Sequence, residues 1–427
     1  MTDQLYILID GEEIGDLYYD RQADQISFSY RSSWAGSHSA YPISVSLPLG
    51  ASTHSDRTLR HFLSGLLTDN SNVLRAWGKQ FHVSPYNQFD LLKNIGEDCA
   101  GAIQFVQPDR LEKIKSGELD KLTPLSDEEV VQRIHDLKKQ SHAIPLHIDG
   151  RFSLAGAQTK DALQWKDNQW FFPEGRQPTT HILKPQLEDF EGHSINEHFC
   201  LALAKETGIP AASSEVTSFQ NEVVIVVKRY DRSLDSEGIY TRIHQEDFCQ
   251  AMALHPRDKY QADGGPSALQ IISLLRQQST SSETDIDNFL RALTLNWAIA
   301  GTDAHAKNYS ILHAPRGVLR LAPLYDLASF LPYRPPKSRK TKMAMKYGHT
   351  YHLHKIDLHQ WETLAKESKL KPKRVLPLVS EYLEKLREES LPATHALIAE
   401  KHACDFLDIL VEKITAHTNE CLDSLAV

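Results

Sequence analysis

The sequence predicts an α+β protein in which a β-rich part precedes a helical part. Between residues 151 and 240, short apolar runs alternate with turn residues, and EVVIVVK at 222–228 is the continuous β-branched run typical of a buried strand. After about residue 240 the apolar residues recur at helical spacing instead, as in IDNFLRALTLNWAIA at 286–300.

The first ~105 residues are expected to form a unit of strands and one or two helices. LYILID at 5–10 alternates loosely and QISFSY at 25–30 alternates strictly, as strands do, and CAGAIQFV at 99–106 also predicts a strand. Between them, RTLRHFLSGLLTDNSNVLRAWGKQF at 57–81 predicts an amphipathic helix or a pair of helices. The polar stretch that follows is rich in Lys, Glu and Asp, and we expect a partly helical connection there.

The β-rich part begins with FSLAGAQTKDALQW at 152–165, which predicts two strands joined by a small-residue turn. THILKP at 180–185 predicts a short strand with a lysine, and INEHFCLALAKETGIP at 195–210 predicts a helix. HQEDFCQAMAL at 244–254 and SALQIISLLRQQ at 267–278 are expected helices. The expected division is an N-terminal subdomain over 1–108, a connecting segment over 109–150, a β-rich lobe over 151–240 and a helical lobe over 241–427.

Composition limits the class of protein. At 427 residues, with 41% hydrophobic and 24% charged residues, the chain is typical of a soluble protein of two or three domains. The net charge of −9 argues against a chain that binds nucleic acid over its whole surface. The five cysteines are scattered without a C-x-x-C motif, which fits a reducing cytoplasm. We expect no signal peptide, because the N-terminus is acidic, and no membrane span.

NWAIAGTDAHAKNYSILH at 296–313 places dense polar chemistry between two apolar segments. Asp303 and Asn308 form the pattern D-x-x-x-x-N, the spacing of the acid and the metal-binding amide in a protein-kinase catalytic loop. The acid can orient an attacking hydroxyl and accept its proton, while the amide oxygen can hold a metal ion. In a rival interpretation, Asp303, His305 and His313 ligate the metal of a hydrolase, although no H-E-x-x-H motif accompanies them.

Two further residues each have a functional and a structural interpretation. In LAPLYDLAS at 321–329, Asp326 ends an apolar run, where a strand could present its carboxylate to a cation; alternatively, Asp326 is the N-cap of a helix. Lys184 in THILKP can reach phosphate oxygens as a point charge; alternatively, it is a solvated lysine at a strand edge.

The turn in FSLAGAQTK holds one glycine, Gly156, between Ala155 and Ala157. Small residues between strands let backbone N–H groups approach an anion, although an ordinary hairpin also uses them. Glu197, on the next predicted helix, could pair with Lys184 as the helix glutamate does in kinases, and the strand at 222–228 would join the two lobes. The pieces then follow the order found in protein kinases: phosphate loop, lysine, helix acid, inter-lobe strand, D-x-x-x-x-N and metal-binding acid. We therefore predict a protein-kinase-like two-lobe α+β fold with an extra N-terminal subdomain.

The ordered motifs FSLAGAQTK, THILKP, NEHFCLALAKETG, VVKRYDR, QEDFCQAM, DGGP, GTDAHAKNYS and LAPLYDLAS resemble those of the HipA family of bacterial serine/threonine kinases. These kinases are the toxins of type II toxin–antitoxin modules. The resemblance covers nearly the whole chain, and the first ~105 residues are similar to the family's N-terminal subdomain.

The resemblance implies a role for each matching residue. Asp303 would be the catalytic base, and Asn308 and Asp326 would hold Mg²⁺. The ATP phosphates would contact Lys184 and the loop of Ala155, Gly156, Ala157, Gln158, Thr159 and Lys160. The rest of the nucleotide site would comprise Lys228, Arg229, Tyr230, Gln245, His305, Lys307 and Tyr325, with Lys228 in place of the expected glutamate. Ser153 matches the family's autophosphorylated serine.

The resemblance also implies partners. The protein substrate would be an aminoacyl-tRNA synthetase such as the glutamyl enzyme, whose phosphorylation arrests growth and promotes persistence. The antitoxin would be a helix-turn-helix protein of the HipB type, which links the toxin to operator DNA. Two other functions stay open: a small-molecule kinase of the antibiotic-kinase type and an inactive binding module. The basic segment LPYRPPKSRKTKMAMK at 331–346 is either a solvated loop or a surface that recruits an acidic or tRNA-bound substrate.

Overall fold

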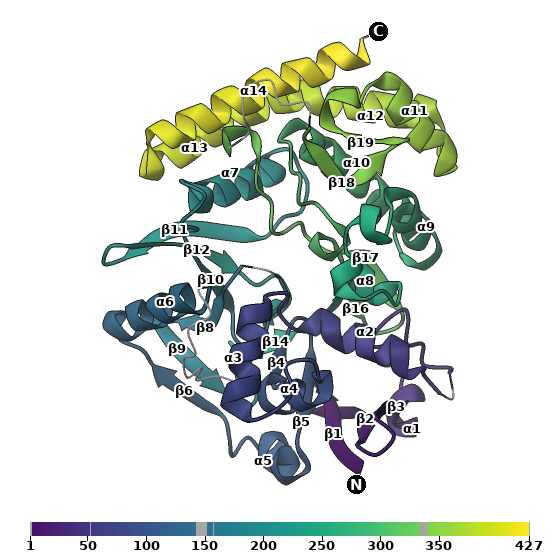
Figure 1. Cartoon of the computed structure of the whole chain (residues 1–427), viewed down its shortest axis with the longest axis vertical. Helices are drawn as coiled ribbons and strands as arrows, with labels where there is room; N and C mark the ends of the chain where they lie inside the picture. Colours follow the sequence, from purple (N-terminus) through teal and green to yellow (C-terminus); the bar gives the residue numbers. More distant parts are fainter. Residues whose placement is uncertain (1, 52, 142–151, 157, 334–339, 427) are drawn as a thin grey trace. The chain divides into compact units, whose positions relative to one another are not determined.

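The computed structural model describes residues 2–51, 53–141, 152–156, 158–333 and 340–426 (Figure 1). The chain folds into two compact units. The first unit comprises Met1–Pro185, Thr217–Arg257 and Ile311–Val318, and the second comprises Gln186–Val216, Asp258–Ser310 and Leu319–Val427. Among the described residues, none of the helices combines the length and apolar character that a bilayer crossing needs.

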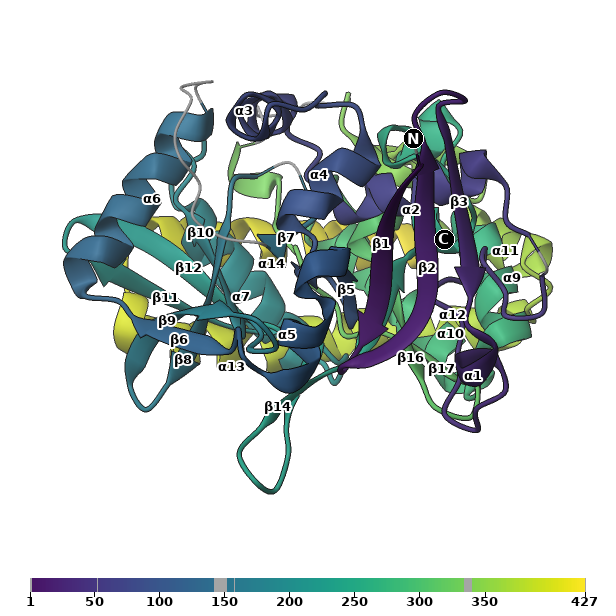
Figure 2. The same ribbon diagram turned by 90° about the horizontal axis from the view of Figure 1, so that it is seen from below.

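The N-terminal part of the first unit is an antiparallel sheet packed against helices. Its strands β1 (Thr2–Ile9), β2 (Glu12–Asp20), β3 (Gln25–Tyr30) and β5 (Ile103–Val106) lie in the order β3-β2-β1-β5 (Figure 2). Leu17 of β2 faces Leu5 on one neighbour and Phe28 on the other. These side chains share one core with α1 (Ser32–Ala35), α2 (Asp56–Leu66), α3 (Ser71–Phe81) and α4 (Gln88–Ile95). The strands expected at 5–10 and 25–30 and the helix pair expected at 57–81 are confirmed.

The second sheet of this unit carries Lys184 on an inner strand. β10 (His181–Pro185) lies between β12 (Glu222–Lys228) and β8 (Asp161–Lys166), and β9 (Gln169–Glu174) and β6 (Lys121–Pro124) follow β8. β11 (Ser213–Phe219), whose residues from Thr217 belong to this unit, follows β12. Helix α6 (Asp127–Ser141) packs Val130 and Ile134 into the core of this sheet (Figure 2). The stretch after residue 108 therefore contributes a strand and a helix to the sheet.

Two elements of the first unit differ from the sequence prediction. CAGAIQFV is not one strand, because a turn at Gly101, with φ +79°, separates β4 (Asp98–Cys99) from β5. A β-carbon at Gly101 would lie 2.7 Å from the backbone nitrogen of Gln245, so only glycine fits this turn. HQED forms β15 (His244–Asp247) rather than the start of a helix. Asp247 caps the short α8 (Phe248–Ala251) in a capping box with Gln250, and the helix therefore begins later than expected.

The second unit is mainly helical, as expected. Its central helix, α10 (Ser282–Ala298), buries Ile286, Phe289, Leu290 and Leu293 at helical spacing and packs against α9 (Ala268–Gln278), α12 (Pro372–Lys385) and α14 (Asp405–Leu425). The other helices are α7 (His193–Glu206), α11 (Leu358–Glu367) and α13 (Leu391–His402), which a π-turn at Leu386–Ser390 joins to α12. A hairpin of β18 (Lys342–Tyr347) and β19 (Thr350–His352) completes the unit.

The remaining elements are short. The first unit holds the turn Pro108–Arg110, α5 (Leu111–Ser116), β7 (Phe152–Ser153) and the hairpin of β13 (Arg232–Leu234) and β14 (Tyr240–Arg242). Strands β16 (Ser310–Ala314) and β17 (Val318–Leu321) follow the candidate catalytic loop. Further 3₁₀ turns lie at Pro256–Asp258, Gln261–Asp263, Ala306–Asn308, Leu331–Tyr333 and Leu353–Lys355.

Candidate active site

The loop that carries Asp303 begins where α10 ends. This end is a Schellman motif, in which the Gly301 N–H donates to the Asn296 carbonyl at 2.7 Å and the Ala300 N–H donates to the Trp297 carbonyl at 3.2 Å. Ala300 has φ +49°, a left-handed conformation that costs a residue with a β-carbon about 1–2 kcal/mol. A β-carbon at Gly301 would lie 2.1 Å from Oδ1 of Asn296, so glycine is needed for this turn.

The two flanks of the loop are joined to each other. Asn296, on the last turn of α10, donates from Nδ2 to the Tyr309 hydroxyl at 3.0 Å, and Tyr309 follows the loop directly. The Tyr309 ring is buried and packs edge-on against Phe289 of the same helix. A core helix and a buried strand thus hold the polar loop from both ends, as the apolar flanks in the sequence predict.

Asp303 and Asn308 form one hydrogen-bonded unit. Nδ2 of Asn308 donates to the Asp303 carbonyl at 2.8 Å, and the backbone N–H of His305 donates to the same oxygen at 2.7 Å. Oδ1 of Asn308 has no hydrogen-bond partner among the described residues, so it can serve a ligand. The Asp303 side chain is 69% exposed, and its Oδ1 accepts a hydrogen bond from the Tyr260 hydroxyl. Oδ2 has no such partner in the described part of the chain and is open to a substrate hydroxyl.

His305 is a buried neutral side chain in this loop. Burial lowers the pKa of His305 to about 4, although the carboxylates of Asp303 and Asp326 oppose the shift. Its Nε2 lies 3.9 Å from Oδ1 of Asp303, and its Nδ1 is buried and has no hydrogen-bond partner among the residues that the structure describes. His313 instead bonds Glu246 at 2.8 Å, and the described residues include no cluster of three or more His, Cys, Asp or Glu that could hold a metal. These contacts count against the metallohydrolase interpretation.

Tyr325 fastens the segment of Asp326 to the catalytic loop. Its hydroxyl donates to the Lys307 carbonyl at 2.7 Å and bonds the Ser310 hydroxyl at 2.6 Å. Asp326 lies in a bend with φ +57°, so both expectations of its local structure, a strand end and a helix N-cap, are wrong. A left-handed residue that is not glycine is a local strain of the kind that clusters at functional sites.

Asn308 and Asp326 fit a Mg²⁺ ion by the chemistry of their side chains. Asn308 directly follows Lys307, and Asp326 directly follows Tyr325. The hydrogen bond between Tyr325 and Lys307 keeps the two segments together. An amide oxygen and a carboxylate oxygen are hard donors, and Mg²⁺ usually takes its other ligands from water and substrate phosphates. A magnesium site of this kind therefore needs no cluster of acidic ligands.

The expected phosphate loop lies in the first unit and is anchored to the N-terminal helices. The Gly156 carbonyl accepts hydrogen bonds from the Thr68 hydroxyl at 2.9 Å and from the Asp69 N–H at 3.0 Å, both in the connection between α2 and α3. The Ser153 hydroxyl is fully buried and donates to the Leu66 carbonyl at 2.8 Å. β7 pairs in parallel with β4, so the loop after it is not the hairpin of the alternative interpretation.

The other end of this loop is tied to the strand of Lys184. Nε2 of Gln158 donates to the Pro185 carbonyl at 3.0 Å, and Nζ of Lys160 folds back onto the Ala155 carbonyl at 2.7 Å. Thr159 lies half-buried between them, whereas Ala157, also expected at the phosphates, lies outside the described residues. Lys184 is buried on an inner strand, so the interpretation as a solvated edge lysine is wrong.

The residues expected after the inter-lobe strand differ in their exposure. The Lys228 side chain is exposed, and Tyr230 is half-buried, with its hydroxyl donating to Oε1 of Gln245. Gln245 in turn donates to Asp231 at 3.3 Å. Arg229 is different, because its guanidinium is buried and bonds Asp231, the Thr179 hydroxyl and the Cys99 carbonyl. These contacts give the Arg229 side chain a structural role and leave none of its surface to a nucleotide.

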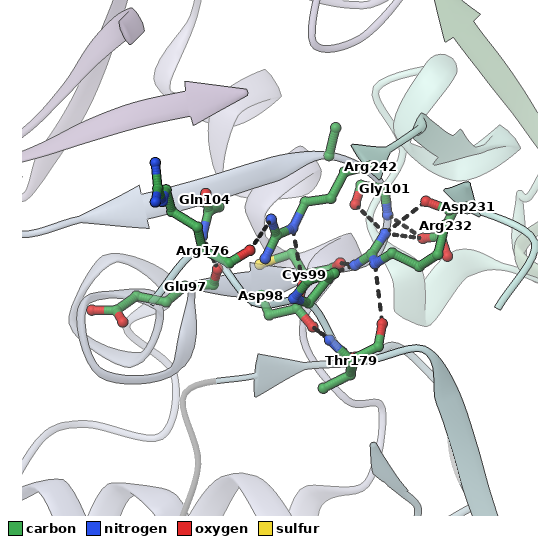
Figure 3. Close-up of polar contacts among 12 residues, drawn as sticks. Glu97, Asp98, Cys99, Gly101, Gln104, Arg176, Thr179, Asp231, Arg232 and Arg242 are labelled. Carbon is green, nitrogen blue, oxygen red and sulfur yellow. Dashed lines mark hydrogen bonds and ion pairs between the residues drawn. The ribbon is translucent and has the colours of Figure 1, made fainter. Parts of the chain in front are cut away.

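Arg229 belongs to a buried ion-pair network at the base of the β13–β14 hairpin. Arg232 and Arg242, which face each other across that hairpin, both bond Oδ1 of Asp98, at 2.8 Å and 3.2 Å (Figure 3). Burial alone would raise the pKa of the Asp98 carboxyl, but the three arginines outweigh it and hold that pKa well below its usual value. Breaking one partner of such a pair typically costs about 3–5 kcal/mol. The network therefore fixes the strand that leads to Tyr230.

Three residues around the candidate site were not predicted from the sequence: Thr68, Tyr260 and Glu246. Thr68 and Tyr260 bond the two candidate loops across 88 and 43 positions of the sequence. Glu246 bonds His313, the Ser44 hydroxyl and the Val45 N–H inside the first unit. Tyr260 immediately precedes the QADGGP turn, and this turn is the one local signal that could have indicated it.

The fold and the site together define the class of protein. A sheet with a buried lysine and a glycine-containing loop, followed by a helical unit with an acid–amide loop and a fastened carboxylate, is the set of parts found in protein-kinase-like phosphotransferases.

Comparisons with known proteins agree. Residues 5–106 match the model of the HipA N-terminal domain, and residues 152–390 match the HipA-like C-terminal domain. The sequence is 38% identical to the putative kinase Y4mE of Sinorhizobium fredii over 98% of this chain and 95% of that protein. It is 32% identical to the serine/threonine-protein kinase toxin HipA of Shewanella oneidensis over 74% of this chain and 72% of that protein. The chain belongs to the HipA family of kinases.

The family assignment extends to the fold. The structure resembles a chain of the Shewanella oneidensis toxin–antitoxin complex of HipA, HipB and operator DNA, with a TM-score of 0.82 and 25% identity, over 98% of this chain and 97% of that chain. The expected kinase-like α+β fold is confirmed by this match.

Proposed function

We propose that the protein is an ATP-dependent serine/threonine protein kinase that acts as the toxin of a toxin–antitoxin module. The observation that carries the proposal is a pair of hydrogen bonds: Asn308 bonds Asp303, and Tyr325, the residue before Asp326, bonds Lys307, the residue before Asn308. A protein kinase needs a carboxylate open to a hydroxyl and two oxygen donors for a metal beside it, and these three side chains supply them.

The proposed reaction transfers the γ-phosphoryl group of ATP to a hydroxyl of a protein. Oδ2 of Asp303 orients the serine or threonine hydroxyl and accepts its proton while the hydroxyl oxygen attacks phosphorus and ADP leaves. Mg²⁺, when bound by Asn308 and Asp326, would neutralise charge on the phosphates. The exposed carboxylate and the fixed loop support this assignment, because little reorganisation is then needed in the transition state.

The proposed ATP site also uses residues of the first unit. Lys184 and the loop of residues 155–160 would contact the phosphates, and Tyr230, Gln245, His305, Lys307 and Tyr325 would surround the nucleotide. The anchoring of that loop through Gly156 and Gln158 supports the assignment, since a phosphate site must be pre-formed to bind with little entropy loss. Lys228 would take part through its backbone, because its exposed side chain is a lysine where the family is expected to have glutamate.

The proposed partners follow from the family. The substrate would be an aminoacyl-tRNA synthetase, for which the glutamyl enzyme is the first candidate, and the antitoxin would be a HipB-type protein bound to operator DNA. The relative from Shewanella oneidensis forms a complex with HipB and operator DNA, which supports the second part. The basic segment 331–346 would recruit the substrate; Arg334, Lys337 and Arg339 lie outside the described residues, whereas Lys340 and Lys342 are exposed.

Ser153 is proposed as the site of self-inactivation. Its hydroxyl is buried and bonded to Leu66, so it can accept phosphate only when the loop leaves this position. A phosphate group carries a charge of roughly −1.5 to −2, and the space at Ser153 has no room for it, so the modified loop would stay displaced. ATP binding would then lose one wall of its site.

The proposal is tested by brief induction of the wild-type protein and of Asp303→Asn in bacteria, followed by phosphoproteomics. We expect a new phosphoserine or phosphothreonine on a synthetase, together with growth arrest, in the wild type alone. New phosphate on a small metabolite with no phosphoprotein would instead indicate a small-molecule kinase. No difference between the two strains would indicate an inactive binding module.

A further inference from the structure

Tyr260 contacts the candidate base directly, and neither the motifs nor the family resemblance assigns it a role. Its hydroxyl donates a hydrogen bond to Oδ1 of Asp303, and its ring packs edge-on against His305 with the ring centroids 5.0 Å apart. Nζ of Lys259 lies 5.8 Å from the centroid of the same ring. All four residues belong to the second unit.

The backbone around Tyr260 is held in a tight turn. The Tyr260 carbonyl accepts hydrogen bonds from the N–H groups of Asp263 and Gly265, at 3.0 Å and 2.9 Å. A β-carbon at Gly265 would lie 2.2 Å from the Asp258 carbonyl, so this glycine is needed for the turn to close. The DGGP sequence therefore has a structural reason to follow Tyr260: it closes a loop around the tyrosine carbonyl.

The turn is also fixed to its surroundings on two sides. The Ala306 N–H, within the catalytic loop, donates to the Lys259 carbonyl at 3.3 Å. On the other side, Oε1 of Gln261 accepts from the Lys346 N–H of β18 at 2.8 Å. The residues before and after Tyr260 are thus both anchored, and the tyrosine ring has a defined place beside the loop.

The chemistry of the base explains why such a donor is useful. The Asp303 side chain is exposed, and a free carboxylate in water rotates between orientations that do not face a substrate hydroxyl. A hydrogen bond to Oδ1 selects one orientation and leaves Oδ2 for the substrate. A phenol donates without bringing a positive charge, so the carboxylate keeps the charge that attracts the proton.

We infer that Tyr260 is a positioning residue for phosphoryl transfer, which acts by holding the Asp303 carboxylate toward the acceptor hydroxyl. The inference rests on the proposed kinase activity. A purely structural tyrosine would act through its ring, which packs on His305 and Lys259, whereas a positioning tyrosine acts through its hydroxyl. Tyr260→Phe separates the two, because it keeps the ring and removes the hydroxyl.

The test compares purified wild-type protein with the variants Tyr260→Phe, Asp303→Asn and Tyr351→Phe. The acceptor is the protein substrate found by phosphoproteomics or, in its place, Ser153 of the protein itself. Tyr351 of β19 is the matched control, since its hydroxyl has no hydrogen-bond partner among the described residues. We expect Tyr260→Phe to lower kcat about 10-fold or more, with KM for ATP, binding of a fluorescent ATP analogue and Tm unchanged. Tyr351→Phe should match the wild type.

A double variant completes the test. Tyr260→Phe added to Asp303→Asn should cause no further loss of kcat, because the tyrosine acts through the aspartate. A kcat of Tyr260→Phe within twofold of the wild type would overturn the inference and leave the kinase proposal intact. A lower Tm, or a loss of ATP affinity as large as the loss of kcat, would also overturn it, since the role of Tyr260 would then be structural. A wild-type protein without any transfer would instead refute the proposed function, and the inference with it.

Discussion

The side-chain amide of Asn308 donates a 2.8 Å hydrogen bond to the backbone carbonyl of Asp303, so the two residues of the D-x-x-x-x-N motif are one structural unit. The D-x-x-x-x-N spacing therefore does two things: it separates the proposed base from the proposed metal ligand, and it lets Asn308 bond the backbone of Asp303. The nitrogen of the amide closes the loop that presents the base, and the oxygen of the same amide remains for the metal. One side chain would thus couple the geometry of the proposed base to that of the proposed metal site.

The coupling predicts that Asn308→Asp is a poor substitution. Aspartate keeps an oxygen for Mg²⁺ but loses the donor to the Asp303 carbonyl and places a second charge beside it. We expect Mg·ATP affinity within a few-fold of the wild type and phosphoryl transfer lowered about 100-fold. Calorimetry and a transfer assay measure the two. Full activity of Asn308→Asp would mean that the amide serves the metal alone.

The close approach of Gly301 to Asn296 predicts a stability effect near the site. In Gly301→Ala the new β-carbon would lie 2.1 Å from Oδ1 of Asn296, so the asparagine must move and its bond to Tyr309 is weakened. We expect a loss of roughly 1–3 kcal/mol in the free energy of unfolding, typical of overpacking, together with lower activity. Gly50→Ala is the control, because a β-carbon at Gly50 would meet nothing within 4 Å. Equal denaturation midpoints for the two variants would contradict the packing argument.

The hydrogen bond from Thr68 to Gly156 predicts that the N-terminal helices help to hold the phosphate loop. Thr68→Val keeps the shape of the side chain and removes the donor, at a cost of about 1 kcal/mol to the anchored loop. We expect a severalfold higher KM for ATP and faster phosphorylation of Ser153, which mass spectrometry can follow. Thr241→Val, at the exposed position of β14, is the matched control. Unchanged KM and unchanged Ser153 phosphorylation would show that the loop does not depend on this bond.

Buried histidines predict how stability changes with pH. Burial lowers the pKa of His244 to about 3 and that of His181 to about 4, whereas the pKa of an unfolded histidine is about 6.5. Between about pH 6.5 and 4 the unfolded chain therefore binds more protons than the folded chain. The contribution of these residues to stability is complete above about pH 6.5 and is lost as the pH falls through this window, by about 1.4 kcal/mol per pH unit for each histidine.

Urea unfolding at pH 7, 6 and 5 measures this slope. His181→Asn should flatten it by about one proton. A slope equal to that of the wild type would show that His181 titrates alike in both states.

Much of the fold follows from local patterns in the sequence. The strand of Lys184, the helix α7 and the two apolar flanks of the Asp303 loop all have hydrophobic runs of the right length, and each element was predicted. The turn of Asp326 was not, because a left-handed aspartate leaves no periodic signal. HQED was predicted as helix because the capping box that starts α8 lies at its end rather than before it.

The candidate site is harder to predict from the sequence, because the residues that hold its loops in place come from distant parts of the chain. Gly156 depends on Thr68, 88 positions away, and Asp303 depends on Tyr260, 43 positions away. Arg229 shows the opposite error. Its position after the inter-lobe strand indicated a ligand contact, but its neighbour Asp231 and two distant residues, Thr179 and Cys99, hold it in a buried network. Residue type and order predict which side chains could carry the chemistry, and tertiary contacts show which of these side chains have a structural role instead, as Arg229 does.

The most direct test of the account is phosphoryl transfer by purified Asp303→Asn from radiolabelled Mg·ATP. Asparagine preserves the shape of the side chain but cannot take the proton of the acceptor hydroxyl. We expect the variant to fold, with an unchanged Tm, and to bind the ATP analogue as the wild type does, while transfer to a protein substrate and to Ser153 falls by several orders of magnitude. Transfer at a rate near that of the wild type would contradict the assignment of Asp303 as the base and, with it, the kinase site described above.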